Sequence, residues 1–201
     1  MKQQMNPAAL HNPDFPDWIA EGKHSAEDLR NVIDHYKCWT DERIREDLAA
    51  TAAPFHAVAE NFAHDFNIST LVRNANAFNA ADVTVVGKRR WDRRGAVGTH
   101  HYTKVSHEGD ARTYYESLAA RNIPIIAVDN VPGSVELPRF TWPEGDIAVI
   151  FGQEAIGVSN LALSYADVCV AVPQRGSVRS MNVGACSAVI MYDYMMKTGR
   201  I

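Results

Sequence analysis

The sequence predicts an α/β fold in which a parallel sheet is flanked by helices. Four short runs, at 83–87, 123–128, 147–151 and 168–172, are almost wholly apolar, which is typical of strands buried on both faces. Helical patterns at 69–78, 110–121 and 182–196 lie between or after them. Because parallel strands need crossover connections, this alternation of strands and helices indicates one sheet covered on both sides.

The first 60 residues have a different pattern, and we expect a helical N-terminal extension over 1–60 ahead of a domain over 61–201. Ser25 followed three residues later by Asp28 matches the spacing of a capping box and predicts a helix over 25–37. Residues 40–61 predict one or two further helices, with Pro54 forcing a break or a new start. The pattern leaves open whether this extension docks on the core, on a second subunit or on a substrate.

Composition places the chain among globular proteins. Its 201 residues are 46% hydrophobic, which is enough to bury a core. Three cysteines without CxxC spacing indicate buried thiols in a reducing compartment. No apolar run approaches the roughly 20 residues of a membrane helix, and the N-terminus lacks the apolar core of a signal peptide. We therefore expect a soluble, cytoplasmic protein that has no membrane partner.

One segment is strongly basic although the whole chain has a formal net charge of −4. Residues 88–104, here called the basic loop, carry six Lys and Arg side chains against a single Asp, with Trp and Tyr among them. Cations contact phosphates and aromatic rings stack on unpaired bases, so this composition favours RNA binding. A solvated loop with a chance cluster of charge is the alternative. The candidate RNA-binding residues are Arg89, Arg90, Arg93 and Arg94.

Several common ligand motifs are missing from the sequence. There is no GxGxxG after the first predicted strand, no P-loop, no HExxH, no GxSxG and no Cys/His cluster at metal spacing. Instead, the predicted strands at 147–151 and 168–172 each lead into a loop rich in Gly, Ser and Asn. Such loops at strand ends form ligand crevices in open α/β sheets. The sequence thus predicts a small-molecule pocket built without a metal ion.

Three segments carry a resemblance to a known family. Residues 67–78, NISTLVRNANAF, resemble the first motif of SpoU/TrmH-type RNA methyltransferases, in which an Asn precedes a helix that bears an Arg. Residues 151–159, FGQEAIGVS, resemble the second motif, and residues 172–183, VPQRGSVRSMNV, resemble the third. The motifs occur in the family's order and span about two thirds of the chain.

This resemblance implies a fold and an activity. It implies the SPOUT architecture, a parallel sheet flanked by helices whose C-terminal segment forms a trefoil knot. It also implies S-adenosylmethionine as cofactor, a homodimer, and methyl transfer to a ribose 2′-hydroxyl of tRNA or rRNA. A non-catalytic RNA-binding relative of the same fold is one alternative, and a nucleotide-dependent oxidoreductase is another.

The resemblance also assigns the candidate site residues. Those for catalysis are Arg73, Asn67, Glu154, Ser180 and Asn182. Those for cofactor binding are Val128, Gly152, Val172, Ser180 and Met181. Helix capping is the alternative role for Ser180 and Asn182, and loop anchoring is the alternative for Glu154.

Arg73 is the candidate on which catalysis depends most. The family's description of this Arg as a general base conflicts with a guanidinium pKa above about 12, so we expect it to grip a phosphate and orient the 2′-hydroxyl. The sequence departs from the family at Ser69 and Asn79, which replace Gly, and at Gln174, which replaces Met. Ser and Asn are compatible with turns, whereas Gln174 changes the wall of the expected cofactor pocket.

Overall fold

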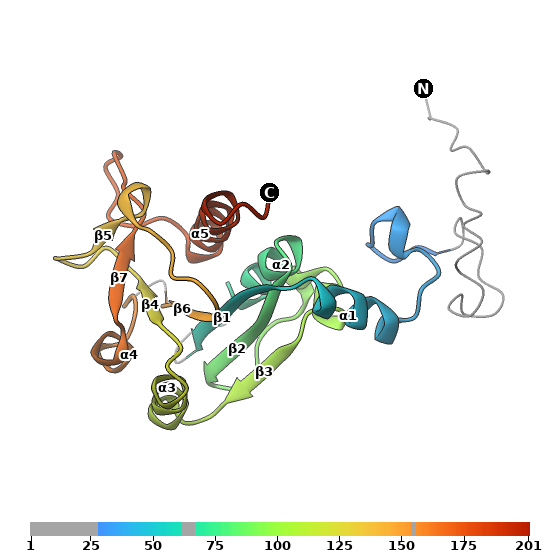
Figure 1. Ribbon diagram of the computed structural model, residues 1–201, viewed down its shortest axis with the longest axis horizontal. Coiled ribbons are helices and arrows are strands. Elements are labelled where there is room, and N and C mark those ends of the chain that lie inside the picture. The colour runs from blue at the N-terminus through green and yellow to red at the C-terminus, as the bar shows by residue number, and fades with distance from the viewer. Residues whose placement is uncertain (1–27, 62–66, 154–155) are drawn as a thin grey trace.

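The computed structural model describes residues 28–61, 67–153 and 156–201. In these ranges seven strands form one sheet in the order β3-β2-β1-β6-β4-β7-β5 (Figure 1). All neighbouring strands are parallel, which confirms the predicted parallel sheet. The strands are β1 Ala53–Asn61, β2 Ala80–Gly87, β3 Val105–Glu108, β4 Ile125–Val128, β5 Val135–Glu136, β6 Ile147–Phe151 and β7 Val168–Ala171.

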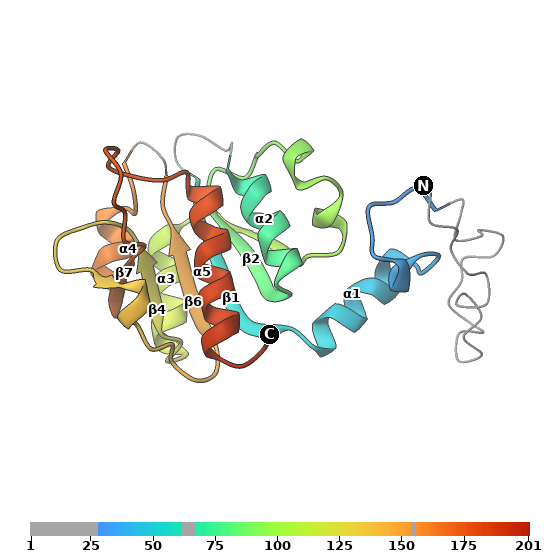
Figure 2. The same ribbon diagram turned by 90° about the horizontal axis from the view of Figure 1, so that it is seen from above.

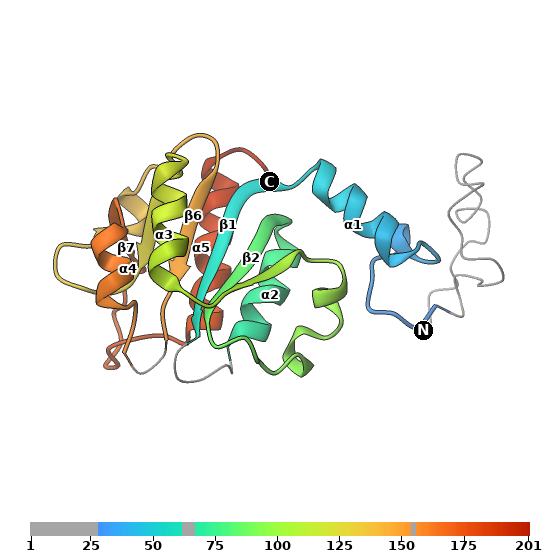
Figure 3. The same cartoon turned by 90° about the horizontal axis from the view of Figure 1, so that it is seen from below.

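Helices cover both faces of this sheet. Helices α2 (Ile68–Ala77) and α5 (Val183–Lys197) pack on one face, and both lie in front of the strands in Figure 2. Helices α3 (Ala111–Ala120) and α4 (Asn160–Tyr165) pack on the other face, which Figure 3 shows. Alternate strand residues such as Val149 and Ile150 therefore enter different cores, and both are fully buried. This two-sided burial explains the apolar runs in the sequence.

Side-chain caps define where several helices begin. The Asp110 carboxylate accepts from the backbone N–H of Arg112 at α3, and the Ser159 hydroxyl accepts from that of Ala162 at α4. Asn182 caps α5 by accepting from the N–H of Ala185 at 3.1 Å. Each cap satisfies a donor that the first helical turn leaves unpaired.

The expected helix over 25–37 is wrong for its described part. Residues 28–37 contain a single short 3-10 turn, η2 Asp34–Tyr36. Asp28 accepts hydrogen bonds from the Cys38 backbone N–H and the Arg30 guanidinium, and Lys37 donates to the carbonyls of Asp28 and Arg30. These local side-chain bonds satisfy the backbone of a folded loop and so compete with the helix.

The expected helix after Pro54 is also wrong, because residues 53–61 form strand β1 near the middle of the sheet. Pro54 lies at the second position of this strand, where the missing N–H costs little. Residues 57–61 are all buried, since helices cover both sides of β1. The helix predicted before Pro54 is confirmed as α1 Asp41–Ala50, which Thr40 caps.

Helix α1 extends away from the sheet toward residues 28–40 (Figure 1). A small core joins it to the segment before it and to the end of the basic loop through Trp39, Ile44 and Tyr102. Arg45 of α1 also donates a 2.8 Å hydrogen bond to the carbonyl of His101. The N-terminal segment is therefore attached to the core at the basic loop.

Candidate active site at the carboxyl edge of the sheet

The parallel strands bring the predicted site loops to one edge. Phe151 at the end of β6 is paired with Ala59 of β1 on one side and with Val128 of β4 on the other. Val128 is in turn paired with Val170 of β7. The segments that follow β1, β6, β4 and β7 therefore leave the sheet side by side, as expected for a ligand crevice in an α/β fold.

The candidate cofactor residues line this edge. Val128 is buried, while Val172 and Met181 are half-buried. Residues 173–181 make no backbone–backbone hydrogen bond with the residues that the structure describes, so their peptide groups are available to a ligand. The carbonyl of Arg179 accepts from the Asn130 side chain at 3.2 Å, which links the loop after β7 to the loop after β4.

Gly152 is required by a close approach of two backbone segments. Gln153 and Gly157 exchange two backbone hydrogen bonds of 2.9 and 2.8 Å, so the chain folds back directly after β6. A Cβ on Gly152 would overlap the backbone of Gly157 and Val158. Apolar walls, unpaired peptide groups and a glycine at a strand end fit the binding of an adenine-containing cofactor such as S-adenosylmethionine.

Asn67 and Asn182 bring the first and third motifs together. The Asn182 amide donates a 2.9 Å hydrogen bond to Oδ1 of Asn67 at the start of α2. Asn182 also caps α5, so the alternative capping role is observed, and its role in catalysis stays a prediction. Ser180, two residues earlier, is exposed at the same end of α5. Glu154 lies outside the described residues.

Arg73 is exposed on α2, and its guanidinium makes no hydrogen bond or ion pair with the described part of the chain. The helix that carries it is fixed against α5. Asn74 donates to the carbonyl of Gly184 at 2.8 Å and to the Ser187 hydroxyl at 2.9 Å. A Cβ on Gly184 would lie 2.8 Å from Thr70 Cγ2. Two helices that are hydrogen bonded to each other thus present an exposed cation that has no ion-pair partner among the described residues.

The basic loop is anchored at its start by Asn61, a buried residue at the end of β1. The Asn61 amide donates to the carbonyls of Lys88 and Arg90 at 2.7 and 3.2 Å. Arg89, Arg90 and Arg93 are exposed and form no ion pair among the described residues. The guanidinium of Arg93 lies 5.8 Å from the centre of the Trp91 ring. A cation and an aromatic face are therefore adjacent, as RNA binding requires.

Arg94 differs from the other three predicted RNA-binding residues. It forms a 2.6 Å ion pair with Asp92, and this contact lowers the pKa of the Asp92 carboxyl to about 2. The pair is neutral at physiological pH. Arg94 therefore contributes less free positive charge to the loop than the sequence predicts.

The departures from the family pattern at Ser69 and Asn79 have structural explanations. Ser69 is buried on α2 against the basic loop, and a Cβ on Gly95 of that loop would overlap the Ser69 hydroxyl. The absence of a side chain at Gly95 leaves the space that Ser69 occupies. Asn79 has a φ of +47°, a left-handed conformation that Asn tolerates better than most residues.

The sequence reasoning missed two carboxylates near this edge, Glu60 and Asp129. Glu60 is 3% exposed and bonds to Ser159 and Tyr115. Asp129 accepts from the backbone N–H of Val158 at 2.8 Å. The sequence signal for Glu60 is a charged residue at the end of an apolar run, as in residues 57–61, AVAEN, because a charge in such a run indicates a buried carboxylate with specific partners.

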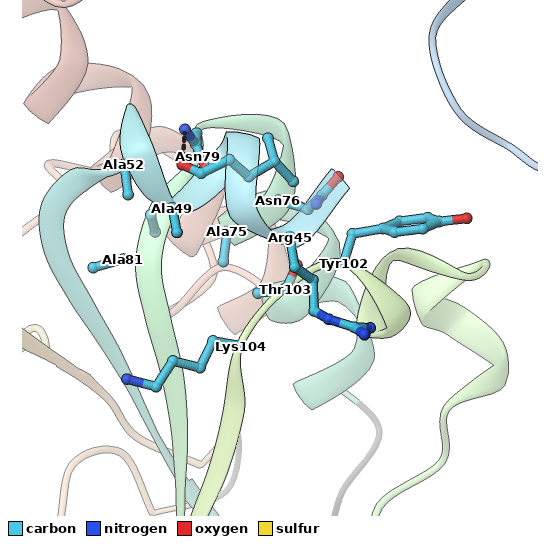
Figure 4. A pocket seen from close by; sticks show the side chains of 12 residues that line it. Arg45, Ala49, Ala52, Ala75, Asn76, Asn79, Ala81, Tyr102, Thr103 and Lys104 are labelled. Atoms are coloured by element: carbon cyan, nitrogen blue, oxygen red, sulfur yellow. Dashed lines mark hydrogen bonds between the residues drawn. The ribbon is translucent and has the colours of Figure 1, made fainter. Parts of the chain in front are cut away.

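A cavity of about 230 Å³ lies at the opposite, amino edge of the sheet (Figure 4). It forms where α1 and Ala52 meet α2, β2 and the end of the basic loop, and Arg45 and Lys104 stand at its rim. The Thr103 hydroxyl beside it is buried without a hydrogen-bond partner among the described residues. This cavity lies at the opposite edge of the sheet from Asn67, Gly152 and Asn182.

Two features are absent from the described ranges. None of the helices there is long and apolar enough to cross a membrane. No three His, Cys, Asp or Glu side chains converge there in a way that would hold a metal ion. The predicted independence of metal ions stays a prediction.

Fold and site together define a parallel α/β protein in which the candidate cofactor residues lie at the carboxyl edge of the sheet and a basic loop starts at the same edge. The chain belongs to the SpoU rRNA methylase family, because the model of that family matches residues 54–192. The match includes all three motifs and strand β1 from Pro54 onward.

Individual relatives agree with this assignment. The chain is 25% identical over 143 residues to a tRNA (guanosine(18)-2′-O)-methyltransferase of Borreliella burgdorferi; the match covers 70% of this chain and 65% of that enzyme. It resembles the solved A. aeolicus TrmH/SpoU tRNA modifying enzyme with a TM-score of 0.70 and 21% identity, over 80% and 83% of the two chains. It also resembles the methyltransferase AviRb of Streptomyces viridochromogenes in complex with AdoMet, with a TM-score of 0.64 and 20% identity, over 71% and 57%.

Proposed function

We propose that this protein transfers the methyl group of S-adenosylmethionine to a ribose 2′-hydroxyl of tRNA or rRNA. The observation that carries the proposal is the Asn182–Asn67 hydrogen bond, because it joins the motif that bears Arg73 to the motif that bears the cofactor candidates. Membership of the SpoU family supports the same reaction. Relatives named as tRNA 2′-O-methyltransferases support RNA as the substrate.

Binding of the cofactor is assigned to the crevice at the carboxyl edge. Val128, Val172 and Met181 would contact the adenine, and the free peptide groups of residues 173–181 would hydrogen bond to its polar atoms. Bound there, S-adenosylmethionine supplies a methyl group on a positively charged sulfur. The 2′-oxygen would attack that methyl carbon in line with the breaking carbon–sulfur bond, its proton would pass to solvent water, and neutral S-adenosylhomocysteine would leave.

Arg73 is assigned to the RNA. Its guanidinium stays protonated, so it pairs with a backbone phosphate and orients the 2′-hydroxyl toward the methyl group. The hydrogen bond between Asn67 and Asn182 holds the start of α2 against the start of α5. Ser180 lies two residues before Asn182. The exposed Arg89, Arg90 and Arg93 contact phosphates farther along the RNA.

We also propose the trefoil knot of the SPOUT architecture. The segment between β4 and β6 lies on the same face of the sheet as α5, where Trp142 donates to Asp193 and Lys197 donates to the carbonyl of Leu137. The chain after β7 has to pass this segment to reach α5. An N-terminal extension outside the knotted domain is proposed as well, and because β1 belongs to the sheet, the extension is placed before Ala53 instead of ending at residue 60.

A homodimer is proposed on the exposed face of α5. Val189, Tyr192 and Met196 are 38%, 53% and 50% exposed, and their spacing of three and four residues puts them on one stripe of the helix. An apolar stripe of this kind is typical of an interface. Tyr192→Glu is expected to convert a dimer to a monomer in sedimentation equilibrium, and an unchanged mass would contradict the assignment.

The activity is tested with labelled S-adenosylmethionine and separate pools of tRNA and rRNA. We expect transfer to one pool without added metal. Cofactor binding without transfer to either pool would instead support an RNA-binding protein that has no catalytic activity. Bound nicotinamide in the purified protein would support the oxidoreductase alternative.

A further inference from the structure

Two carboxylates lie symmetrically about the central strand β6. Phe151 ends β6, and its partners in the neighbouring strands are Ala59 of β1 and Val128 of β4. The next residue after each partner is acidic, namely Glu60 on one side and Asp129 on the other. The two carboxylates therefore flank the point where the chain leaves β6.

Both carboxylates bind the chain just before helix α4. Asp129 Oδ2 accepts from the backbone N–H of Val158 at 2.8 Å, and Glu60 Oε2 accepts from that of Ser159 at 2.7 Å. Glu60 Oε1 also accepts from the Ser159 hydroxyl at 2.5 Å. Two consecutive peptide groups are thus held from opposite sides by charge-assisted hydrogen bonds.

The segment held in this way is residues 156–159 directly before α4, here called the β6–α4 loop. Gly152 belongs to the candidate cofactor site, and its backbone touches Gly157 and Val158. Gly157 in turn leaves no space for a side chain beside the Asp129 carboxylate. Any shift of Val158 or Ser159 would therefore displace Gly152.

We propose that Glu60 and Asp129 form a carboxylate clamp that positions the β6–α4 loop for cofactor binding. The proposal rests on the proposed function, and it makes both residues positioning residues that act through the loop. A buried carboxylate is costly unless it is fully hydrogen bonded, and an apolar residue would fill the end of β1 at lower cost. Glu60 instead directs both oxygens at Ser159, which explains a charge at this position.

The variants Glu60→Gln and Asp129→Asn test the clamp, because each keeps the side-chain volume and removes the charge. Tyr115→Phe is the matched control. The Tyr115 hydroxyl donates to Glu60 Oε1 at 2.9 Å and is buried, so its loss perturbs the same carboxylate without touching the loop. Ser159→Ala is a second variant in case Glu60→Gln does not fold: it removes the hydroxyl that bonds to Glu60 and caps α4, and it keeps the backbone N–H that donates to Glu60.

The first measurement is amide hydrogen exchange, which needs no cofactor. We expect faster exchange at Val158 and Ser159 in Glu60→Gln and Asp129→Asn, and wild-type exchange there in Tyr115→Phe. Equal protection in all variants would overturn the clamp even if the protein proves to be an active methyltransferase.

The second measurement is calorimetric titration with S-adenosylmethionine, together with the KM for RNA. We expect about a tenfold higher Kd for the cofactor in Glu60→Gln, a smaller rise in Ser159→Ala, and an unchanged KM for RNA in both. If Glu60→Gln lowers the thermal stability and leaves the Kd for the cofactor unchanged, Glu60 serves only to stabilise the fold, and the proposal is overturned. A wild-type protein that does not bind the cofactor would overturn the proposed function, whatever the exchange data show.

Discussion

The side-chain amide of Asn182 lies 2.9 Å from Oδ1 of Asn67, so the start of α5 is hydrogen bonded to the start of α2. Asn182 Oδ1 meanwhile accepts from the backbone N–H of Ala185. One side chain therefore caps a helix with its oxygen and joins two motifs with its nitrogen. The two functions can be separated by mutation.

Asn182→Asp keeps an oxygen for the cap and removes the donor to Asn67. We expect thermal stability close to wild type and a large loss of methyl transfer, because the two helix starts lose their direct link. Asn182→Ala removes both functions and is expected to cost about 1 kcal/mol of unfolding free energy as well. Chemical denaturation and a transfer assay on both variants measure these effects. Full activity in Asn182→Asp would show that methyl transfer does not depend on the Asn182–Asn67 hydrogen bond.

Arg73→Ala is expected to abolish methyl transfer and leave cofactor affinity nearly unchanged. Arg73 is exposed and makes no contact with the described residues that its loss would break, so the unfolding free energy should change by less than about 0.5 kcal/mol. Arg73→Lys keeps the charge without the bidentate geometry and should retain partial activity. Wild-type transfer by Arg73→Ala would show that another side chain acts on the RNA.

The basic loop predicts a specific salt dependence. Arg93→Ala and Arg89→Ala should each lower the slope of log affinity against log salt by about one, since each removes an exposed, unpaired cation. The double variant Asp92→Asn, Arg94→Gln removes the neutral ion pair and keeps the net charge. It should leave the slope unchanged in filter-binding titrations with RNA, and a slope reduced as in Arg93→Ala would mean that Arg94 leaves Asp92 to bind phosphate.

His56 predicts a pH dependence of stability. Its Nδ1 lies 3.0 Å from Asp82, and this hydrogen bond raises the His56 pKa above its ordinary value against the opposing effect of burial. Asp146, at 3.5 Å from Nε2, acts in the same direction. The stabilisation is complete below the unfolded pKa of about 6.5 and is lost as the pH rises through the folded value. The free energy of unfolding should therefore fall more steeply above pH 6.5 in wild type than in His56→Gln.

We predict that a side chain at position 184 disturbs the packing of α5 against α2. A Cβ at this position would lie 2.8 Å from Thr70 Cγ2, so Gly184→Ala must push α5 away from α2. We expect a loss of about 1–3 kcal/mol in unfolding free energy. Gly176→Ala is the control, because Gly176 faces open space, and equal stability of the two variants would show that the helices adjust freely.

Much of the sheet could be predicted from the sequence because apolar runs report burial on both faces. The runs at 83–87, 123–128, 147–151 and 168–172 all became strands, and α2, α3 and α5 matched their predicted ranges within a few residues. Strand β1 was missed because Pro54, His56 and Glu60 interrupt its apolar pattern. The hydrogen-bond partners of the two polar residues, Asp82 for His56 and Ser159 for Glu60, lie far away in the sequence.

The sequence supplied candidate site residues but not the contacts between them. The motifs identified Asn67, Arg73, Gly152 and Asn182, and the structure brings Asn67 and Asn182 into direct contact. The carboxylate clamp was not predictable, because each of its members is an ordinary acidic residue until the strand order places β1 and β4 on either side of β6. The Asp92–Arg94 pair shows the same limit, since a count of charges does not reveal which charges neutralise each other.

The position of the transferred methyl group tests the central claim most directly. RNA labelled by the wild-type protein is hydrolysed with alkali, which cleaves every linkage except one next to a 2′-O-methyl ribose. We predict that the label appears in a single alkali-resistant dinucleotide and is absent when Arg73→Ala replaces the wild type. Label in mononucleotides, which would place the methyl group on a base, would contradict ribose methylation by this site.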